Sequence, residues 1–296
     1  MKQLLFIVNP MAGKSAYKTN FGEALLALHN GGYTPTLRFT SAPGDAIRMA
    51  QEAAGYDLVC CLGGDGTLSE TMEGLVQLPE AQRPPIGYIP LGTANDVATT
   101  LGLPKNNIMA AVNRILQGNV RDFDVGTFGE NGNFTYVAAF GAFTDVSYET
   151  PQQEKQALGH FAYVLEGMMR LPKITQYHAK IEYDRGVVED DFVFGGIMNS
   201  TSVAGLIHLN SNQIKLDDGL FELALVRSPR NILDLRQIVT ALINRNYNGP
   251  FIKFLATSQA KFTFDQPVAW TRDGEEGGVY QEISFKNLNK AVQIIA

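Results

Sequence analysis

The first 120 residues alternate between short apolar runs and longer stretches with helical periodicity. Continuous apolar runs bounded by polar turns predict strands covered on both faces. They fall at residues 4–8, 34–40, 57–62 and 86–89. Helix-compatible stretches follow at residues 16–30, 43–54, 67–77, 97–101 and 106–117. Because strands and helices alternate, we predict a parallel sheet with helices on both faces.

The pattern changes after Val120, where short strand-like segments become the rule. These segments lie at residues 134–140, 177–183, 192–198, 220–227, 261–265, 268–272, 279–285 and 292–295. Helical periodicity returns only at 155–171 and 231–244. The pattern predicts an α/β domain over residues 1–125, joined by a strand near 288–296. An all-β, sandwich-like domain over 126–287 follows, and we expect a cleft between the two.

Composition narrows the classes of function. A chain of 296 residues with 45% hydrophobic residues can bury two medium-sized cores. Its formal net charge of −6 argues against nucleic-acid binding through bulk charge. The apolar run 4–8 is too short for a signal peptide, and no run approaches the roughly 18 residues of a membrane span. Cys60 and Cys61 are adjacent in an apolar run, which predicts buried, reduced thiols. We therefore expect a cytoplasmic protein whose membrane contact is peripheral.

The loop Gly63-Gly64-Asp65-Gly66-Thr67 directly follows a predicted strand and precedes a predicted helix. Glycine lets backbone N–H groups approach a ligand closely, and the start of a helix favours phosphate. The carboxylate of Asp65 would repel a phosphate unless it bound a cation or accepted a hydrogen bond. The loop therefore predicts a metal-assisted phosphate site. A tight turn between strand and helix is the structural alternative.

Other polar loops follow the neighbouring predicted strands, beginning at Asn9, at Thr40 and at Leu91. Gly13-Lys14-Ser15 is similar to the end of a P-loop, but that motif needs glycine where this chain has Val8. In parallel sheets, ligands bind beyond the carboxyl ends of the strands. Four polar loops in that position predict one ligand site, although a capped turn would explain any one of them.

Two motifs together resemble the diacylglycerol kinase catalytic-domain family, and its soluble bacterial members most closely. They are Gly63-Gly64-Asp65-Gly66-Thr67 and Pro90-Leu91-Gly92-Thr93-Ala94-Asn95-Asp96. NAD kinases and phosphofructokinases carry loops similar to the first motif, whereas the second is specific to the lipid kinases. Three further segments continue the pattern in the expected order over the whole chain: Asp122-Phe123-Asp124-Val125-Gly126, Lys215-Leu216-Asp217-Asp218-Gly219-Leu220 and Asp273-Gly274-Glu275.

The resemblance implies a lipid kinase of phospholipid metabolism that uses ATP and Mg²⁺ to phosphorylate a hydroxyl of a diacylglycerol-like lipid. It implies an NAD kinase-like nucleotide-binding domain at 1–125 and a lipid-binding domain carrying the catalytic base at 126–287. The residues it implies for nucleotide binding are Asn9, Pro10, Met11, Ala12, Gly13, Thr40, Gly63, Gly64, Asp65, Gly66, Thr67, Leu68, Ser69, Thr93 and Glu275.

Carboxylates carry the implied chemistry. If Asp65, Asp96 and Asp124 converge, they could hold Mg²⁺ through waters. Helix capping for Asp96 and a turn for Asp124 are the alternatives. Asp273 is implied as the general base for the lipid hydroxyl, although Asp-Gly between two strands is also a hairpin-turn signal.

The resemblance also implies a structural magnesium site in the loop Lys215-Leu216-Asp217-Asp218-Gly219-Leu220. Its ligands would be Asp218 and the carbonyls of Lys215 and Leu220. A polar entry to the following strand is the alternative. Glu275 would share the nucleotide or metal environment.

The predicted helix 155–171 has an apolar face, with Lys155, Arg170 and Lys173 near its ends. This face would suit a membrane surface that presents the lipid substrate, or it packs on its own sheet. Two other functions stay open: an NAD kinase-like enzyme, and a non-catalytic regulator that binds nucleotide or lipid. The sequence does not identify the lipid, and it leaves a homodimer open.

Overall fold

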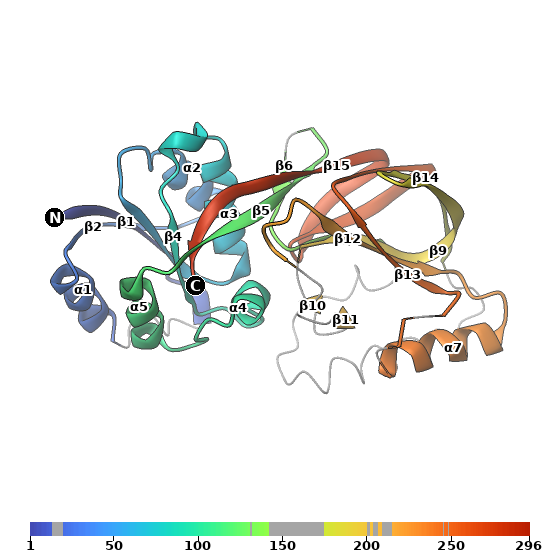
Figure 1. The fold of residues 1–296 in the computed structure, drawn as a ribbon, viewed down its shortest axis with the longest axis horizontal. Helices are drawn as coiled ribbons and strands as arrows, with labels where there is room; N and C mark the ends of the chain where they lie inside the picture. The colour runs from blue at the N-terminus through green and yellow to red at the C-terminus, as the bar shows by residue number, and fades with distance from the viewer. Residues whose placement is uncertain are drawn as a thin grey trace. The chain divides into compact units, whose positions relative to one another are not determined.

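The chain divides into two compact units, shown in Figure 1. One comprises Met1–Val125 with Leu288–Ala296, and the other Gly126–Asn287. The computed structural model describes residues 1–13, 20–130, 132–141, 175–199, 202–203, 207–208, 215–244, 246–247 and 249–296. The predicted helix at 155–171 lies outside these described residues.

The first unit is built on a parallel sheet in the order β15-β4-β3-β1-β2. Its strands are β1 (Lys2–Val8), β2 (Tyr33–Phe39), β3 (Leu58–Gly63), β4 (Ile86–Pro90) and the last residues of β15 (Glu275–Ile295). Nearly every side chain of β1, β3 and β4 is buried, as expected for strands covered on both faces. The register places Val8 beside Phe39 and Leu62, so these strands end at the same edge.

Helices cover both faces of this sheet. They are α1 (Phe21–Asn30), α2 (Asp45–Gln51), α3 (Asp65–Val76), α4 (Asp96–Leu101) and α5 (Ile108–Gln117), with a short 3₁₀ helix at Glu80–Gln82. Cys60 packs in one core with α1 and α5, whereas the thiol of Cys61 hydrogen-bonds to Thr71 of α3. Adjacent strand residues point to opposite faces, so the two thiols are kept apart. Burial raises the pKa of Cys61 to about 12.

The predicted start of the helix after the glycine motif is wrong. The sequence predicted a loop through Thr67, but α3 begins at Asp65, after an extended Gly64. The N–H of Leu68 donates to the carbonyl of Gly64 at 3.1 Å and closes the first turn. The second half of the glycine motif is therefore the first turn of a helix, with its N–H groups directed away from the helix body.

The second unit is rich in antiparallel β structure around an aromatic core. Its elements are the end of β5 (Val120–Phe128), β6 (Gly132–Phe134), β7 (Val137–Gly141), β8 (Tyr177–Tyr183), β9 (Gly186–Met198), β10 (Ser202–Val203), β11 (Ile207–His208), β12 (Phe221–Arg227), α7 (Ile232–Ile243), β13 (Ile252–Thr257), β14 (Gln259–Arg272) and most of β15. Both β9 and β14 pair with β7 near one end and with β8 near the other, so the strands fold around a common interior. Phe262, Trp270 and Phe285 are fully buried there with their rings in contact.

Three strand predictions differ from the structure. The predicted strands 261–265 and 268–272 are one strand, β14, because a register shift between Thr263 and Val268 absorbs the interruption. Likewise 279–285 and 292–295 belong to a single β15, which continues through a polar stretch that the pattern does not mark as a strand. β13 was not predicted, since its residues lack clear alternation of buried and exposed positions.

The fourth difference concerns the predicted strand 134–140. It is broken at Thr135 and Tyr136, and β6 ends before the break while β7 begins after it. The N–H groups at the break donate to a side chain far along the chain. Long-range hydrogen bonds therefore cause the break, and the side chain that accepts them belongs to the candidate site.

Candidate functional site

The first of the polar loops is joined to the glycine motif by Asn9. Its side-chain Nδ2 donates to Oγ1 of Thr67 at 3.0 Å, and its Oδ1 accepts from the N–H of Met11 at 2.9 Å. Thr40 begins the loop after β2, and its N–H donates to the carbonyl of Val8 at 2.9 Å. Three of the predicted nucleotide-binding positions thus lie at the same edge of the sheet.

The two diagnostic motifs pack backbone against backbone. A Cβ added at Gly92 would lie 2.5 Å from Cα of Gly64, and one added at Gly64 would lie 3.1 Å from Cα of Gly92. The N–H of Leu91 donates to the carbonyl of Gly63 at 2.8 Å. Only glycine permits so close an approach of two loops.

Asp65 connects the same two motifs through its side chain. Its Oδ2 accepts from the N–H of Asp96 at 3.0 Å, and its Oδ1 from the N–H of Val97 at 3.3 Å. These are orphan donors at the start of α4, so the buried carboxylate caps that helix from another motif. Asp65 therefore accepts hydrogen bonds, which is one of the two alternatives under which a carboxylate can stand in a phosphate loop.

Asn95 closes the second motif and was not among the site residues predicted from the sequence. Its Oδ1 accepts from the N–H of Gly92 at 2.9 Å, and its Nδ2 donates to the carbonyl of Gly92 at 2.7 Å. Asn95 is fully buried and has a φ of 54°, a left-handed conformation that asparagine tolerates. Asparagine directly before a predicted helix is the signal that could have identified it.

Besides burial, the negative charges of Asp65 and Asp96 both raise the pKa of the buried Tyr88 hydroxyl. Burial, followed by the negative charge of Asp65 and more weakly that of Asp96, raises the pKa of Tyr88 well above its usual value. The edge of the sheet thus has negative charge and hard oxygen donors, which suit Mg²⁺. Within the described ranges, no group of three His, Cys, Asp or Glu side chains is arranged to hold a metal ion.

Asp124 is fully buried and accepts hydrogen bonds from residues of β15. Its Oδ1 accepts from Nδ2 of Asn289 at 3.1 Å and from the N–H of Lys290 at 2.6 Å. Lys290 has a φ of 53°, so the carboxylate supports a strained point in that strand. The convergence of Asp124 with Asp65 and Asp96 on one cation stays a prediction.

Asp273 has an unusual position in the second unit. It forms a two-residue turn with Gly274 between β14 and β15, and both residues have positive φ, 49° and 83°. This backbone is the hairpin turn that Asp-Gly signals. The Asp273 side chain is 7% exposed, so the turn residue points inward.

The carboxylate of Asp273 holds the break between β6 and β7. Its Oδ2 accepts from the N–H of Thr135 at 2.7 Å, and its Oδ1 from those of Tyr136 and Val137 at 3.0 and 3.1 Å. The N–H of Asp273 in turn donates to the carbonyl of Val137 at 2.8 Å. Asp273 is therefore fixed in place, and no local sequence signal marks partners that lie 136 to 138 residues away.

The predicted structural metal loop precedes β12. Lys215 and Asp218 are exposed, and Oδ1 of Asp218 accepts from the N–H of Leu220 at 3.1 Å. Burial, together with the charge of Asp218, raises the pKa of Glu222 to about 7. A cation in this loop would lower that pKa, since it would offset the negative charge beside Glu222.

The remaining residues predicted to bind nucleotide differ in their exposure to solvent. Pro10 and Ser69 are half-buried, Gly13, Thr93 and Glu275 are exposed, and Met11 is largely exposed. Ala12 and Leu68 are buried, so Leu68 can offer a nucleotide only its backbone. Gly66 lies in the first turn of α3. Glu275 begins β15 opposite Arg272, directly after the Asp273 turn.

Glu70 is a positioning residue that was not among the site residues predicted from the sequence. From α3 it reaches the start of α2: Oε1 accepts from the N–H of Gly44 at 2.8 Å, and Oε2 from that of Ala46 at 3.1 Å. The same loop is held by Asp45, whose Oδ2 accepts from the N–H and hydroxyl of Ser41. These bonds fix the segment that follows Thr40.

We expect Glu70→Gln to destabilise the protein by about 1–3 kcal/mol, because one of the two backbone donors would face an amide N–H₂ instead of an oxygen. Denaturant titration measures the loss. Glu23→Gln, at an exposed position of α1, is the control and should change stability by less than about 0.5 kcal/mol. Equal stability of the two variants would contradict the role of Glu70.

The comparisons with known proteins point to one family. Residues 3–128 match the family model described as "Diacylglycerol kinase catalytic domain". The chain is 31% identical to the diacylglycerol kinase of Bacillus subtilis (strain 168), over 100% of this chain and 96% of that protein. It is 34% identical to the diacylglycerol kinase of Staphylococcus aureus (strain JH9), over 100% and 92%.

A solved structure extends the likeness to the fold. The crystal structure of a diacylglycerol kinase from Bacillus anthracis str. Sterne superposes with a TM-score of 0.76 at 25% identity, covering 99% of this chain and 96% of that one. The alignment with the Bacillus subtilis relative covers both units of this chain, so the resemblance is not confined to the glycine motifs. The chain therefore belongs to the diacylglycerol kinase family of lipid kinases.

Proposed function

We propose that the protein uses ATP and Mg²⁺ to transfer the γ-phosphate to a hydroxyl of a diacylglycerol-like lipid. The observation that carries the proposal is the close packing of Gly64 on Gly92, with Asp65 capping α4, at the carboxyl edge of a parallel sheet. A site of this kind offers backbone donors and negative charge side by side. Phosphoryl transfer needs such positioning and charge neutralisation more than it needs covalent chemistry.

The nucleotide would lie across the four loops at this edge. Asn9 and Thr67 already share a hydrogen bond there, and Gly63 to Ser69 contributes the first turn of α3. Gly64, the residue before α3, has no side chain that could cap the helix, and the first N–H groups of a helix of 12 residues suit a phosphate. Pro10, Met11, Ala12, Gly13, Thr40 and Thr93 complete the proposed site.

Asp65, Asp96 and Asp124 are the proposed ligands of a magnesium ion bound through waters. When bound, magnesium neutralises charge on the phosphates of ATP. Asp65 keeps a structural task as well, because it holds the start of α4. Asp218 and the carbonyls of Lys215 and Leu220 are the proposed ligands of a separate structural ion.

Asp273 is the proposed general base. The lipid hydroxyl oxygen would attack the γ-phosphorus, the bond from that phosphorus to the bridging oxygen of ADP would break, and the hydroxyl proton would pass to the Asp273 carboxylate. Three backbone N–H groups fix the position of this carboxylate, which is what a placed base requires. Glu275, two residues further on, would face the same nucleotide or metal environment.

The lipid substrate would be presented at a membrane surface, with the protein in peripheral contact with it. Among the described residues, the structure has no helix long and apolar enough to span a bilayer. The proposed location is the cytoplasm.

The proposal is tested by incubating the protein with γ-labelled ATP, Mg²⁺ and mixed micelles of several neutral lipids. We expect label in the phosphorylated diacylglycerol, and no transfer when EDTA removes the metal. Formation of NADP from NAD and ATP, with no lipid product, would replace the proposal with an NAD kinase. ATP binding without phosphate transfer to any lipid would favour a non-catalytic regulator.

A further inference from the structure

The first turn of α7 exposes two adjacent large apolar side chains. Ile232 is 49% exposed and Leu233 is 62% exposed, whereas Leu235, Ile238 and Leu242 on the other face are buried. Single exposed apolar residues are ordinary, but neighbouring ones at the end of an amphipathic helix indicate a contact surface.

This turn is held firmly by its own caps. Oδ1 of Asn231 accepts from the N–H groups of Leu233 and Asp234 at 2.8 and 3.0 Å. Oδ2 of Asp234 accepts from the N–H of Arg230 at 3.0 Å, so the caps are reciprocal. The apolar pair is therefore presented by an ordered turn, at little entropic cost to a partner.

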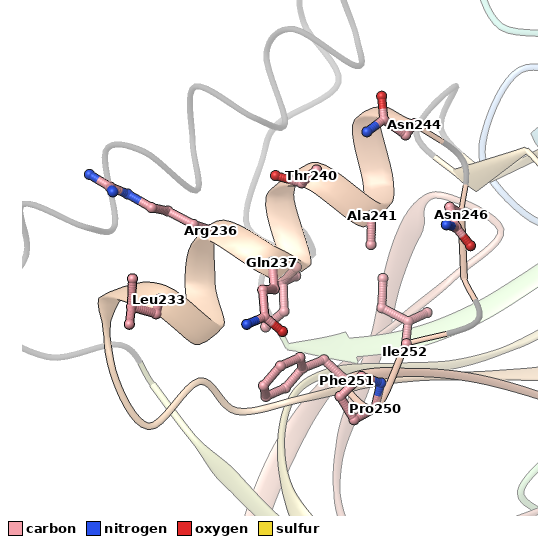
Figure 2. Close-up of a pocket in the computed structure, with 12 residues that line it drawn as sticks. Leu233, Arg236, Gln237, Thr240, Ala241, Asn244, Asn246, Pro250, Phe251 and Ile252 are labelled. Carbon is pink, nitrogen blue, oxygen red and sulfur yellow. The ribbon is translucent and has the colours of Figure 1, made fainter.

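A pocket of about 560 Å³ continues the surface between α7 and the start of β13. Leu233 and Arg236 line it from the helix, and Pro250, Phe251 and Ile252 from the strand side. Figure 2 shows Arg236 extended away from Pro250 and Phe251, near the same end of α7 as Leu233. Apolar and cationic groups thus occur together along one side of the helix.

The charge beside the apolar pair differs in sign from that of the whole protein. Arg230 and Arg236 are exposed on either side of Ile232 and Leu233, although the chain has a formal net charge of −6. The carboxylate nearest in sequence, Asp234, is engaged in capping. Apolar anchors flanked by arginines are typical of surfaces that bind the interface of an anionic bilayer.

We propose that the N-terminal turn of α7 docks the protein on an anionic lipid bilayer. Ile232 and Leu233 enter the boundary between headgroups and acyl chains, while Arg230 and Arg236 bind lipid phosphates. The inference rests on the proposed function, because a lipid kinase must reach a substrate held in a bilayer. It assigns the membrane contact to α7, a different segment from the 155–171 stretch that the sequence predicted.

Vesicle sedimentation tests the proposal with the full chain. The wild type should bind vesicles of phosphatidylcholine with phosphatidylglycerol, and bind pure phosphatidylcholine weakly. Ile232→Ser with Leu233→Ser should reduce binding about ten-fold or more, since two large apolar side chains lose their burial. Arg236→Gln should weaken binding to the anionic vesicles and reduce its dependence on salt.

Val187→Ser is the matched control, because Val187 is 56% exposed on β9 of the same unit but lies outside this surface. It should bind vesicles as the wild type does. Thermal melting and circular dichroism confirm that each variant is folded. Wild-type binding by the double variant, or equal losses in the double variant and in Val187→Ser, would overturn the proposal.

Kinase assays separate this inference from the proposed function. The double variant should phosphorylate a short-chain diacylglycerol dispersed in water normally, and lose turnover of long-chain diacylglycerol in vesicles. Normal turnover of both by the double variant would refute docking by α7 and leave the kinase proposal standing. If the wild type phosphorylates neither, yet the double variant still loses vesicle binding, the function fails and the docking surface remains.

Discussion

Gly92→Ala is expected to remove most kinase activity and to weaken ATP binding. Its new Cβ would lie 2.5 Å from Cα of Gly64 and 2.8 Å from Oδ1 of Asn95. Neither neighbour can rotate away, since one is backbone and the other is hydrogen-bonded to the same loop. The two motifs must separate, and a displacement of about 1 Å in a positioned site can cost about 10² in rate. Steady-state kinetics and calorimetric titration with ATP measure both effects.

Gly22→Ala is the matched control for that substitution. Gly22 lies in α1 of the same unit, and a Cβ there would meet nothing within 4 Å. Alanine in a helix is favoured over glycine by roughly 0.5–1 kcal/mol, so this variant should be at least as stable as the wild type and equally active. Wild-type turnover by Gly92→Ala would show that the close packing of the two motifs is not needed for the reaction.

Asp273→Asn is expected to lower phosphoryl transfer by about 10²–10⁴, the contribution of a placed general base. Stability should fall as well, by about 1–3 kcal/mol, because the amide can replace only one of two accepting oxygens. The N–H groups of Thr135, Tyr136 and Val137 would then lack part of their acceptor. ATP affinity should be nearly unchanged, since all proposed nucleotide-binding residues except Glu275 belong to the other unit.

The two roles of Asp273 can be separated by measuring rates where the variant is fully folded. A purely structural role predicts that activity follows the folded fraction, and that the pH dependence of kcat keeps its shape. A base predicts a large rate loss in folded protein and loss of the acidic limb of the pH profile. Asp184→Asn is the control, because that carboxylate also accepts a backbone N–H, from Ser258, in the same unit. Near-normal turnover by folded Asp273→Asn would rule out the base.

The sequence by itself determined the parallel sheet and the place of its loops. The runs in β1, β3 and β4 are apolar at successive positions, and only strands covered on both faces need that pattern. The glycines of the loop at 63–66 could be recognised as a ligand-binding feature because they let backbone N–H groups approach a ligand closely, whereas the packing of Gly64 on Gly92 came only from the structure. The resemblance to lipid kinases followed from these same motifs, and the comparisons confirm the family.

Only the tertiary structure decided what the carboxylates hold. Asp65 caps a helix that begins 31 residues later, and Asp273 holds a strand break 138 residues before it. The spacing of hydrophobic residues along the sequence indicates which side chains are buried locally. Nothing in the local sequence indicates which distant N–H group will donate a hydrogen bond to a given carboxylate. For the same reason the pattern divided β14 and β15 and joined β6 to β7: in each case long-range pairing, rather than local composition, sets where the strand ends.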